Sequence, residues 1–179
     1  MEKSNKDYIK TAFLQLSFSV KLWNYLKLYP IDKNKFDGPL KVMENRNSIH
    51  FSINEFNTYN DIIFASENNI TICLGAAAIT LWEAIKDKGE YSSAQLPNSL
   101  ATTEQKTAGL IYMIRCCFAH SVAIPRWHIK NERYKIIYSV GSKFIDLRSV
   151  HGNKFDYESI GGYDTLLELR DIALSHNML

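Results

Sequence analysis

The chain has 179 residues, of which 46% are apolar and 22% charged, and its formal net charge at neutral pH is +2. This composition is typical of a globular protein and excludes a disordered chain, while the length suits a single domain over residues 1–179 better than two domains. Because the net charge is so small, the protein as a whole does not attract nucleic acid. Any anionic partner would have to be held by a local cluster of cations.

The cysteines bear on the cellular compartment. There are three of them, Cys73, Cys116 and Cys117, and an odd number with two adjacent favours free thiols in a reducing compartment. The N-terminal residues are polar, and the longest apolar run, at about 70–81, is shorter than the roughly 20 residues of a membrane span. No histidine or cysteine spacing matches a zinc site. We therefore expect a cytoplasmic protein without a membrane span, metal site or cofactor.

The first half of the chain carries two helical patterns. Apolar residues at three- and four-residue spacing predict a helix over about 4–28, which Pro30 ends. A long connection follows, with a possible short strand over 48–53. A second helix is predicted from somewhere after Asn57 to Gly89, and it is apolar on all sides, as a buried helix would be. Its run of small residues, 75–78, would let another helix come close.

The second half predicts two more helices around a small sheet. Thr102 and Gln105 stand at the spacing of a capping box, and the helix that they begin should run to about Ser121. The period then changes to two, over three short segments, 127–130, 134–140 and 143–148. A last helix should cover about 163–175. The pattern predicts a mainly α fold, an up-and-down helical bundle with a small antiparallel β-meander at about 127–148, before the last helix.

The third of these helices has two distinct faces. The side predicted to face the core carries Leu110, Ile114, Cys117, Phe118 and Ser121. Two polar residues, Arg115 and His120, are five apart and hence about 140° apart around the axis. Between them lies a face without charge, formed by Ala108, Tyr112, Cys116 and Ala119. Such a face invites a second packing partner, either the rest of the domain or another copy of the chain.

The stretch from Arg115 to His120 resembles the Arg-x4-His motif of the HEPN superfamily, whose members are helical-bundle proteins of prokaryotic toxin and defence systems. The resemblance implies a metal-independent endoribonuclease that acts as a homodimer with both motifs in one shared cleft. Arg115 would then stabilise the scissile phosphate, and His120 would move a proton to or from a reacting oxygen. The residue after the arginine is commonly polar in this family, whereas it is Cys116 here.

A basic and aromatic cluster follows this motif. It comprises Arg126, Trp127, His128 and Lys130, with Arg133 and Lys135 beyond them. Cations of this kind bind the nucleic-acid backbone, and aromatic rings stack on bases, so the cluster is a candidate RNA-binding surface. The alternative is a solvated face of the predicted meander with the tryptophan packed beneath it.

Two functional hypotheses remain open. In the first, the chain is a HEPN-like ribonuclease. In the second, favoured by Cys116, it is a non-catalytic HEPN-like module that dimerises or binds a nucleotide or a partner protein such as an antitoxin. Purely structural roles are also possible for the motif, because Arg115 could pair with Glu83 or Asp87, and His120 could cap its own helix. A reactive thiolate beside Arg115 is a weaker alternative.

Overall fold

The computed structural model describes residues 4–44, 47–51, 55–91 and 96–179. The chain divides into two compact units, one formed by residues 1–17 and 71–179 and the other by residues 18–70. We describe each unit by itself and call the first the main unit. The prediction of a single domain over residues 1–179 stays a prediction.

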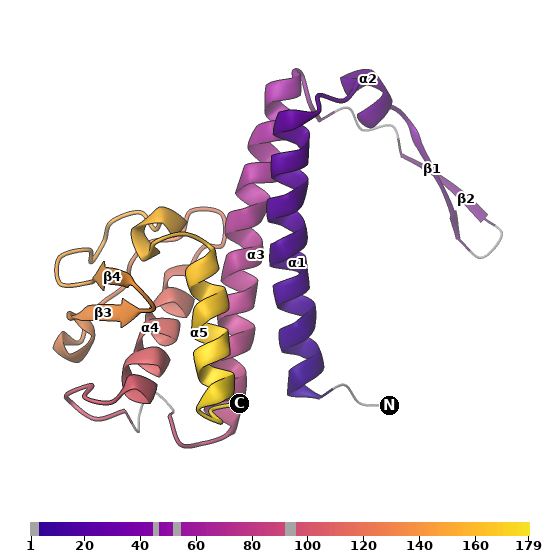
Figure 1. The fold of residues 1–179 in the computed structure, drawn as a ribbon. Coiled ribbons are helices and arrows are strands. Elements are labelled where there is room, and N and C mark those ends of the chain that lie inside the picture. Colours follow the sequence, from indigo (N-terminus) through magenta and orange to yellow (C-terminus); the bar gives the residue numbers. More distant parts are fainter. Residues whose placement is uncertain (1–3, 45–46, 52–54, 92–95) are drawn as a thin grey trace. The chain divides into compact units, whose positions relative to one another are not determined.

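The described residues are mainly helical, as the sequence predicts (Figure 1). The α-helices are α1 (Asn5–Leu28), α2 (Lys33–Phe36), α3 (Tyr59–Asp87), α4 (Thr103–Phe118) and α5 (Asp164–Ser175). The strands are β1 (Leu40–Glu44), β2 (Asn47–Phe51), β3 (Ile137–Val140) and β4 (Lys143–Asp146), and two short 3-10 helices are η1 (Glu132–Tyr134) and η2 (Tyr157–Ile160). The starts of α1, α4 and α5 lie within two residues of their predicted positions, and α3 begins after Asn57, as predicted.

Local signals explain these helix ends. The Thr102 hydroxyl accepts from the Gln105 N–H at 3.3 Å, and the Gln105 side chain accepts from the Thr102 N–H at 3.2 Å, which confirms the predicted capping box of α4. At the end of α3, Gly89 has a φ of +88°, a conformation that side-chain-bearing residues rarely adopt. The sequence therefore determines these boundaries through local interactions.

The core of the main unit lies between α3, α4 and α5, with the first part of α1 against it. The fully buried side chains on these helices include Leu16, Leu74, Leu81, Ile85, Leu110, Ile114, Leu166 and Leu169. The predicted core face of α4 is confirmed for its apolar members, since Cys117 and Phe118 are buried as well. On α5 the buried side chains include Leu166, Leu169 and Ala173.

The small residues of α3 allow α4 to come close. A Cβ atom added to Gly75 would lie 2.4 Å from Cδ1 of the Phe118 ring. We expect Gly75→Leu to lower the free energy of unfolding by about 1–3 kcal/mol, because the added side chain would displace that ring. Ala76 is exposed on the same helix, so Ala76→Leu is the matched control and should change stability little. Urea unfolding measures both, and equal midpoints would contradict the prediction.

The predicted β-meander is wrong in its first strand. The described residues of this region form one two-stranded antiparallel hairpin, in which β3 pairs with β4, and Figure 1 shows it beside α4 and α5. Residues 127–130 are not a strand, because only one isolated bridge, between Arg126 and Lys154, pairs this part of the chain. Alternation of side chains alone does not provide a neighbouring strand to bond to.

The second unit contains a hairpin that the sequence did not predict. The connection over 30–48 contains α2 and β1, and β1 pairs antiparallel with β2. The predicted strand over 48–53 is confirmed as far as Phe51, and residues 52 and 53 lie outside the described residues. Buried Asp37 accepts from the backbone N–H groups of Glu55 and Phe56, at 3.3 Å and 3.1 Å, and so links the segment before β1 to the segment after β2.

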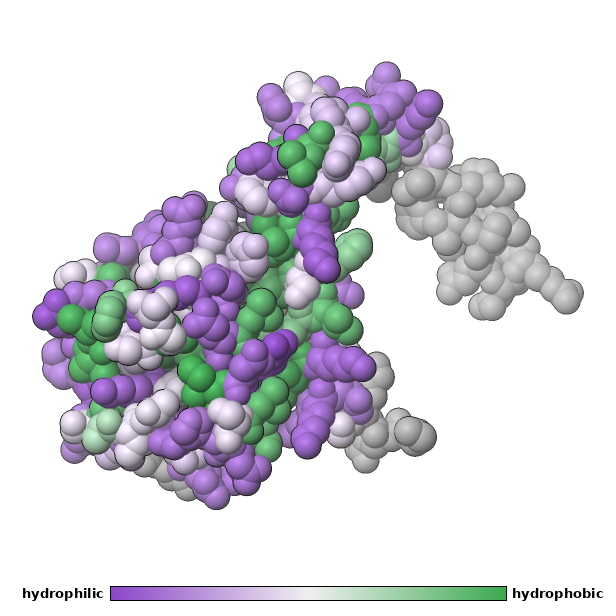
Figure 2. All heavy atoms as spheres, in the orientation of Figure 1, coloured by the Kyte–Doolittle hydropathy of each residue, from purple (hydrophilic) through white to green (hydrophobic). Residues whose placement is uncertain are grey.

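Apolar residues also reach the surface. Figure 2 shows hydrophobic residues among hydrophilic ones on the visible face, and Leu14, Phe144 and Leu174 of the main unit are all about half exposed or more. By length and composition, α3 alone among the described helices is apolar enough to cross a membrane, with 33% of its most apolar window buried. The central helix of a soluble bundle meets the same criterion. Leu74, Ala77 and Leu81 have no exposed surface.

Candidate functional site

The predicted motif lies where α4 ends. The helix stops at Phe118, and Ala119 caps it with an N–H that donates to the Cys116 carbonyl at 3.4 Å. His120 therefore lies in the bend after the helix, and its predicted position on the helix is wrong. Because the helical geometry does not extend to this residue, the 140° separation from Arg115 does not apply either.

The chain then folds back onto the helix end. The Arg126 N–H donates to the Cys117 carbonyl at 3.2 Å, one of the last carbonyls of α4, which has no partner inside the helix. A hollow of about 440 Å³ forms at this fold. The described residues that line it are Cys117, His120, Ser121, Ile124, Arg126 and His128, none of which is acidic.

Three imidazoles form a cluster, and two of them, His120 and His128, line this hollow. The ring centroids of His120 and His128 are 5.5 Å apart, and those of His128 and His151 are 5.7 Å apart. The Ile129 N–H donates to Nδ1 of His151 at 3.0 Å, which leaves that nitrogen unprotonated. The sequence did not predict a role for His151, because 22 residues separate it from Ile129 and no local pattern connects them. Only the folded chain brings His151 next to Ile129.

The surroundings of His128, the central imidazole, lower its pKa and so favour its neutral form. Partial burial lowers its pKa below the ordinary value of 6.5, and the positive charge of Lys130 and the two neighbouring imidazoles lower it further. A neutral imidazole at physiological pH is able to accept a proton. The hollow therefore contains a group suited to act as a base.

We expect Lys130→Gln to raise the pKa of His128, because the substitution removes a positive charge that disfavours the imidazolium ion. A titration followed by the NMR signals of the His128 ring measures this change. Lys86→Gln is the matched control, because Lys86 is paired with Glu83 on α3 and should leave the His128 pKa where it was. An unchanged midpoint in the Lys130 variant would contradict the prediction.

Cations surround the three imidazoles without acidic partners. The isolated bridge sets Lys154 opposite Arg126, and Arg126 itself donates to the Gly152 carbonyl at 3.1 Å. Within the described part of the chain, neither of these residues nor Lys130 forms a salt bridge. They form a local positive cluster. A protein with so small a net charge needs such a cluster to bind an anion.

Arg115 lies elsewhere. It is half-buried, and it is not among the described residues that line the hollow. Its predicted structural partners are engaged with other groups, since Glu83 pairs with Lys86 at 3.0 Å and Asp87 accepts from Asn5 at 3.3 Å. Arg115 Nε is buried and has no hydrogen-bond partner among the described residues. The cation in the hollow of this chain is thus Arg126.

The structure corrects the prediction for Trp127. This side chain is 2% exposed and packs against the ring of Phe155, with the centroids 5.2 Å apart. A buried ring has no face on which a base can stack, so Trp127 belongs to the core. The alternative reading of the cluster is right for this residue. Its neighbours Arg126 and Lys130 are exposed, as nucleic-acid contacts require.

The uncharged face of α4 is covered largely by the same chain. Ala108 has no exposed surface, and the Tyr112 ring lies 4.7 Å from Trp82 and 5.5 Å from Tyr134, measured between centroids. The rest of the domain, rather than a second copy, thus packs on these two residues. Ala108 is not available to a homodimer, while Cys116 and Ala119 keep exposed surface.

The cysteines are free thiols among the described residues. Burial raises the pKa of Cys117 well above its ordinary value. A thiol with a raised pKa stays protonated and is a poor nucleophile. Thiol chemistry at this residue is therefore disfavoured, although it lines the hollow.

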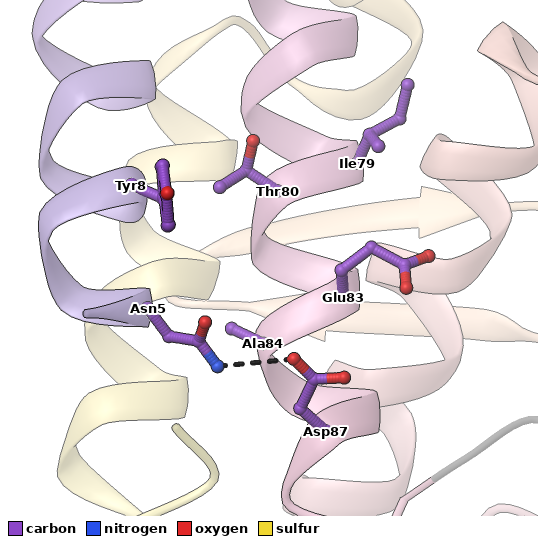
Figure 3. Close-up of a pocket in the computed structure, with 7 residues that line it drawn as sticks. All are labelled: Asn5, Tyr8, Ile79, Thr80, Glu83, Ala84 and Asp87. Carbon is purple, nitrogen blue, oxygen red and sulfur yellow. Dashed lines mark hydrogen bonds between the residues drawn. The ribbon is translucent and has the colours of Figure 1, made fainter. Parts of the chain in front are cut away.

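A second cavity of the main unit, of about 250 Å³, lies between α1 and α3 (Figure 3). It contains two carboxylates, Glu83 and Asp87, and the Asn5 amide donates to the latter. The described residues that line it include no cation. Because its charge repels phosphate, this cavity is a weaker candidate for an RNA site than the hollow at His120.

We compared the chain with protein-family models, with curated proteins and with solved structures, and none matches it.

Proposed function

We propose that this protein is a metal-independent endoribonuclease whose reaction takes place in the hollow at His120. The observation that carries the proposal is the contact of His120 with His128 in a hollow that also contains Arg126. Cleavage of an RNA phosphodiester needs one group that accepts a proton, another that donates one, and a cation for the phosphate. These three side chains supply that set.

The chemistry follows from the positions of these groups. The ribose 2′ oxygen attacks the neighbouring phosphorus atom while the bond from phosphorus to the 5′ oxygen breaks. His128 accepts the proton of the 2′ hydroxyl, and His120 donates a proton to the leaving 5′ oxygen. Arg126 stabilises the charge that develops on the phosphate. The products are a 2′,3′-cyclic phosphate and a 5′ hydroxyl.

The proposal keeps the resemblance to the HEPN superfamily, with an up-and-down helical bundle, a cytoplasmic location and a role in toxin or defence systems. It changes the assignment of the phosphate ligand within one chain, from Arg115 to Arg126. In a homodimer, Arg115 would act on RNA held by the second copy. Arg115 is half-buried, so part of the residue stays accessible to a second copy.

The test is incubation of the protein with single-stranded RNA in the presence of EDTA. We expect cleavage that leaves 2′,3′-cyclic phosphate ends, while DNA of the same sequence stays intact because it lacks the attacking hydroxyl. Light scattering of the same sample measures whether it is a dimer. RNA that stays intact after prolonged incubation would overturn the proposal.

The position of Arg115 outside the hollow favours a second function, the HEPN-like module that binds RNA or a nucleotide without cleaving it. In that case the same cations hold the phosphate, and the histidines contribute hydrogen bonds only. RNA that binds with an affinity that falls steeply with salt, and that is recovered uncut, would support this function.

A further inference from the structure

His128 lines two hollows. One is the hollow at His120, described above. The other, of about 170 Å³, has Tyr112, Cys116 and Asn131 among its other lining residues. A group bound in the second hollow would therefore stand next to a phosphate bound in the first.

The second hollow has one partly exposed aromatic ring and a polar rim. The ring is that of Tyr112, which packs against buried Trp82 and Tyr134, with centroids 4.7 Å and 5.5 Å away. Exposed Lys130 and Asn131 form the rim. A planar, apolar ring with polar edges fits such a lining, because one of its faces can contact the partly exposed Tyr112 ring while its edge reaches the Asn131 amide.

Asn131 is oriented for recognition. Its Oδ1 accepts from the Arg133 N–H at 3.1 Å, which fixes the amide plane. Its two side-chain N–H groups make no hydrogen bond within the described residues and are free to donate. The rim thus presents hydrogen-bond donors, and it selects a ring with acceptor atoms on its edge.

From this arrangement we infer that the second hollow is a nucleobase subsite, which takes the unpaired base next to the scissile phosphate. The inference rests on the proposed function for the identity of the phosphate. It defines the substrate class as single-stranded RNA, because a base in a duplex is stacked on both faces and its edge is already paired. Phosphate and base would then be held in two hollows that share His128.

The test measures binding of a 2′-O-methyl RNA trinucleotide, which cannot be cleaved, against the same trinucleotide with an abasic central residue. We expect the intact trinucleotide to bind about 5- to 100-fold more tightly, the range that stacking of one base gives. Equal affinities would overturn the inference.

Two variants locate the effect. Cys116→Leu narrows the second hollow, and Asn131→Ser removes the amide donors while its hydroxyl still accepts from Arg133. Both should reduce the preference for the intact trinucleotide, and Asn153→Ser, at an exposed asparagine outside the hollow, should keep it. If both variants still prefer the intact trinucleotide, the base binds elsewhere, and the inferred subsite is wrong.

These experiments distinguish failure of the nucleobase subsite from failure of the proposed ribonuclease activity. A protein that cleaves RNA but binds both trinucleotides equally retains the proposed function and loses the subsite. A protein that prefers the intact trinucleotide but leaves natural RNA uncut retains the subsite and loses the nuclease activity.

Discussion

Replacement of His120 by glutamine should lower the rate of RNA cleavage by about 10²- to 10⁴-fold, the range for loss of a general acid or base. Glutamine is close in size to histidine but cannot transfer a proton at neutral pH. Because His120 is exposed and lies after the end of α4, the substitution should leave the free energy of unfolding within about 0.5 kcal/mol of wild type. Initial cleavage rates and urea unfolding measure the two quantities.

The control for this variant is His176→Gln. His176 pairs with Glu104 at 2.6 Å, outside the cluster of three imidazoles, and its loss should leave cleavage unchanged. Equal rates for the His120 and His176 variants would remove His120 from the mechanism.

Substitution of the two arginines distinguishes a site within one chain from a cleft shared by two copies. If Arg126 alone binds the phosphate, Arg126→Gln should reduce cleavage strongly and Arg115→Gln should not. If a HEPN-like dimer forms with a shared cleft, Arg115→Gln should reduce RNA cleavage as well. A protein that cleaves normally without Arg126 would contradict the assignment of the phosphate to the hollow.

Replacement of Trp127 by alanine should lower the free energy of unfolding by about 3–5 kcal/mol, because the substitution empties a large, fully buried site. Trp127 is 2% exposed and contacts the Phe155 ring. Its backbone N–H donates to the Asn153 carbonyl at 2.9 Å, so the residue also joins the segment after α4 to the loop that carries His151. Chemical unfolding followed by circular dichroism measures the loss.

Ile124→Ala is the control for Trp127→Ala, because Ile124 is three residues upstream and 58% exposed. Its truncation should change stability by about 0.5 kcal/mol or less. If Trp127 instead stacked on bases, Trp127→Ala would weaken RNA binding without any loss of stability. That outcome would support base stacking by Trp127, the role that its burial excludes.

The helices follow from the sequence because their signals are local. The periodic apolar residues of α1 and α3, the Thr102 capping box and the glycine after α3 each act within a few residues along the chain. Strand pairing is not local. The segments over 127–130 and 40–44 differ little as patterns, yet only the second is a strand, because only there does the chain supply a partner with a continuous backbone ladder.

The same distinction between local and tertiary information applies to the candidate site. The sequence by itself identified His120, Arg126, His128 and Lys130 as chemically suitable residues, since residue types and their nearness along the chain are visible there. Only the tertiary structure decided which of them meet. It ended α4 before His120, turned Arg126 back onto the Cys117 carbonyl, buried Trp127 and left Arg115 outside the hollow. Hydrogen bonds and packing between distant segments determined these positions, and neither is encoded in the spacing of a motif.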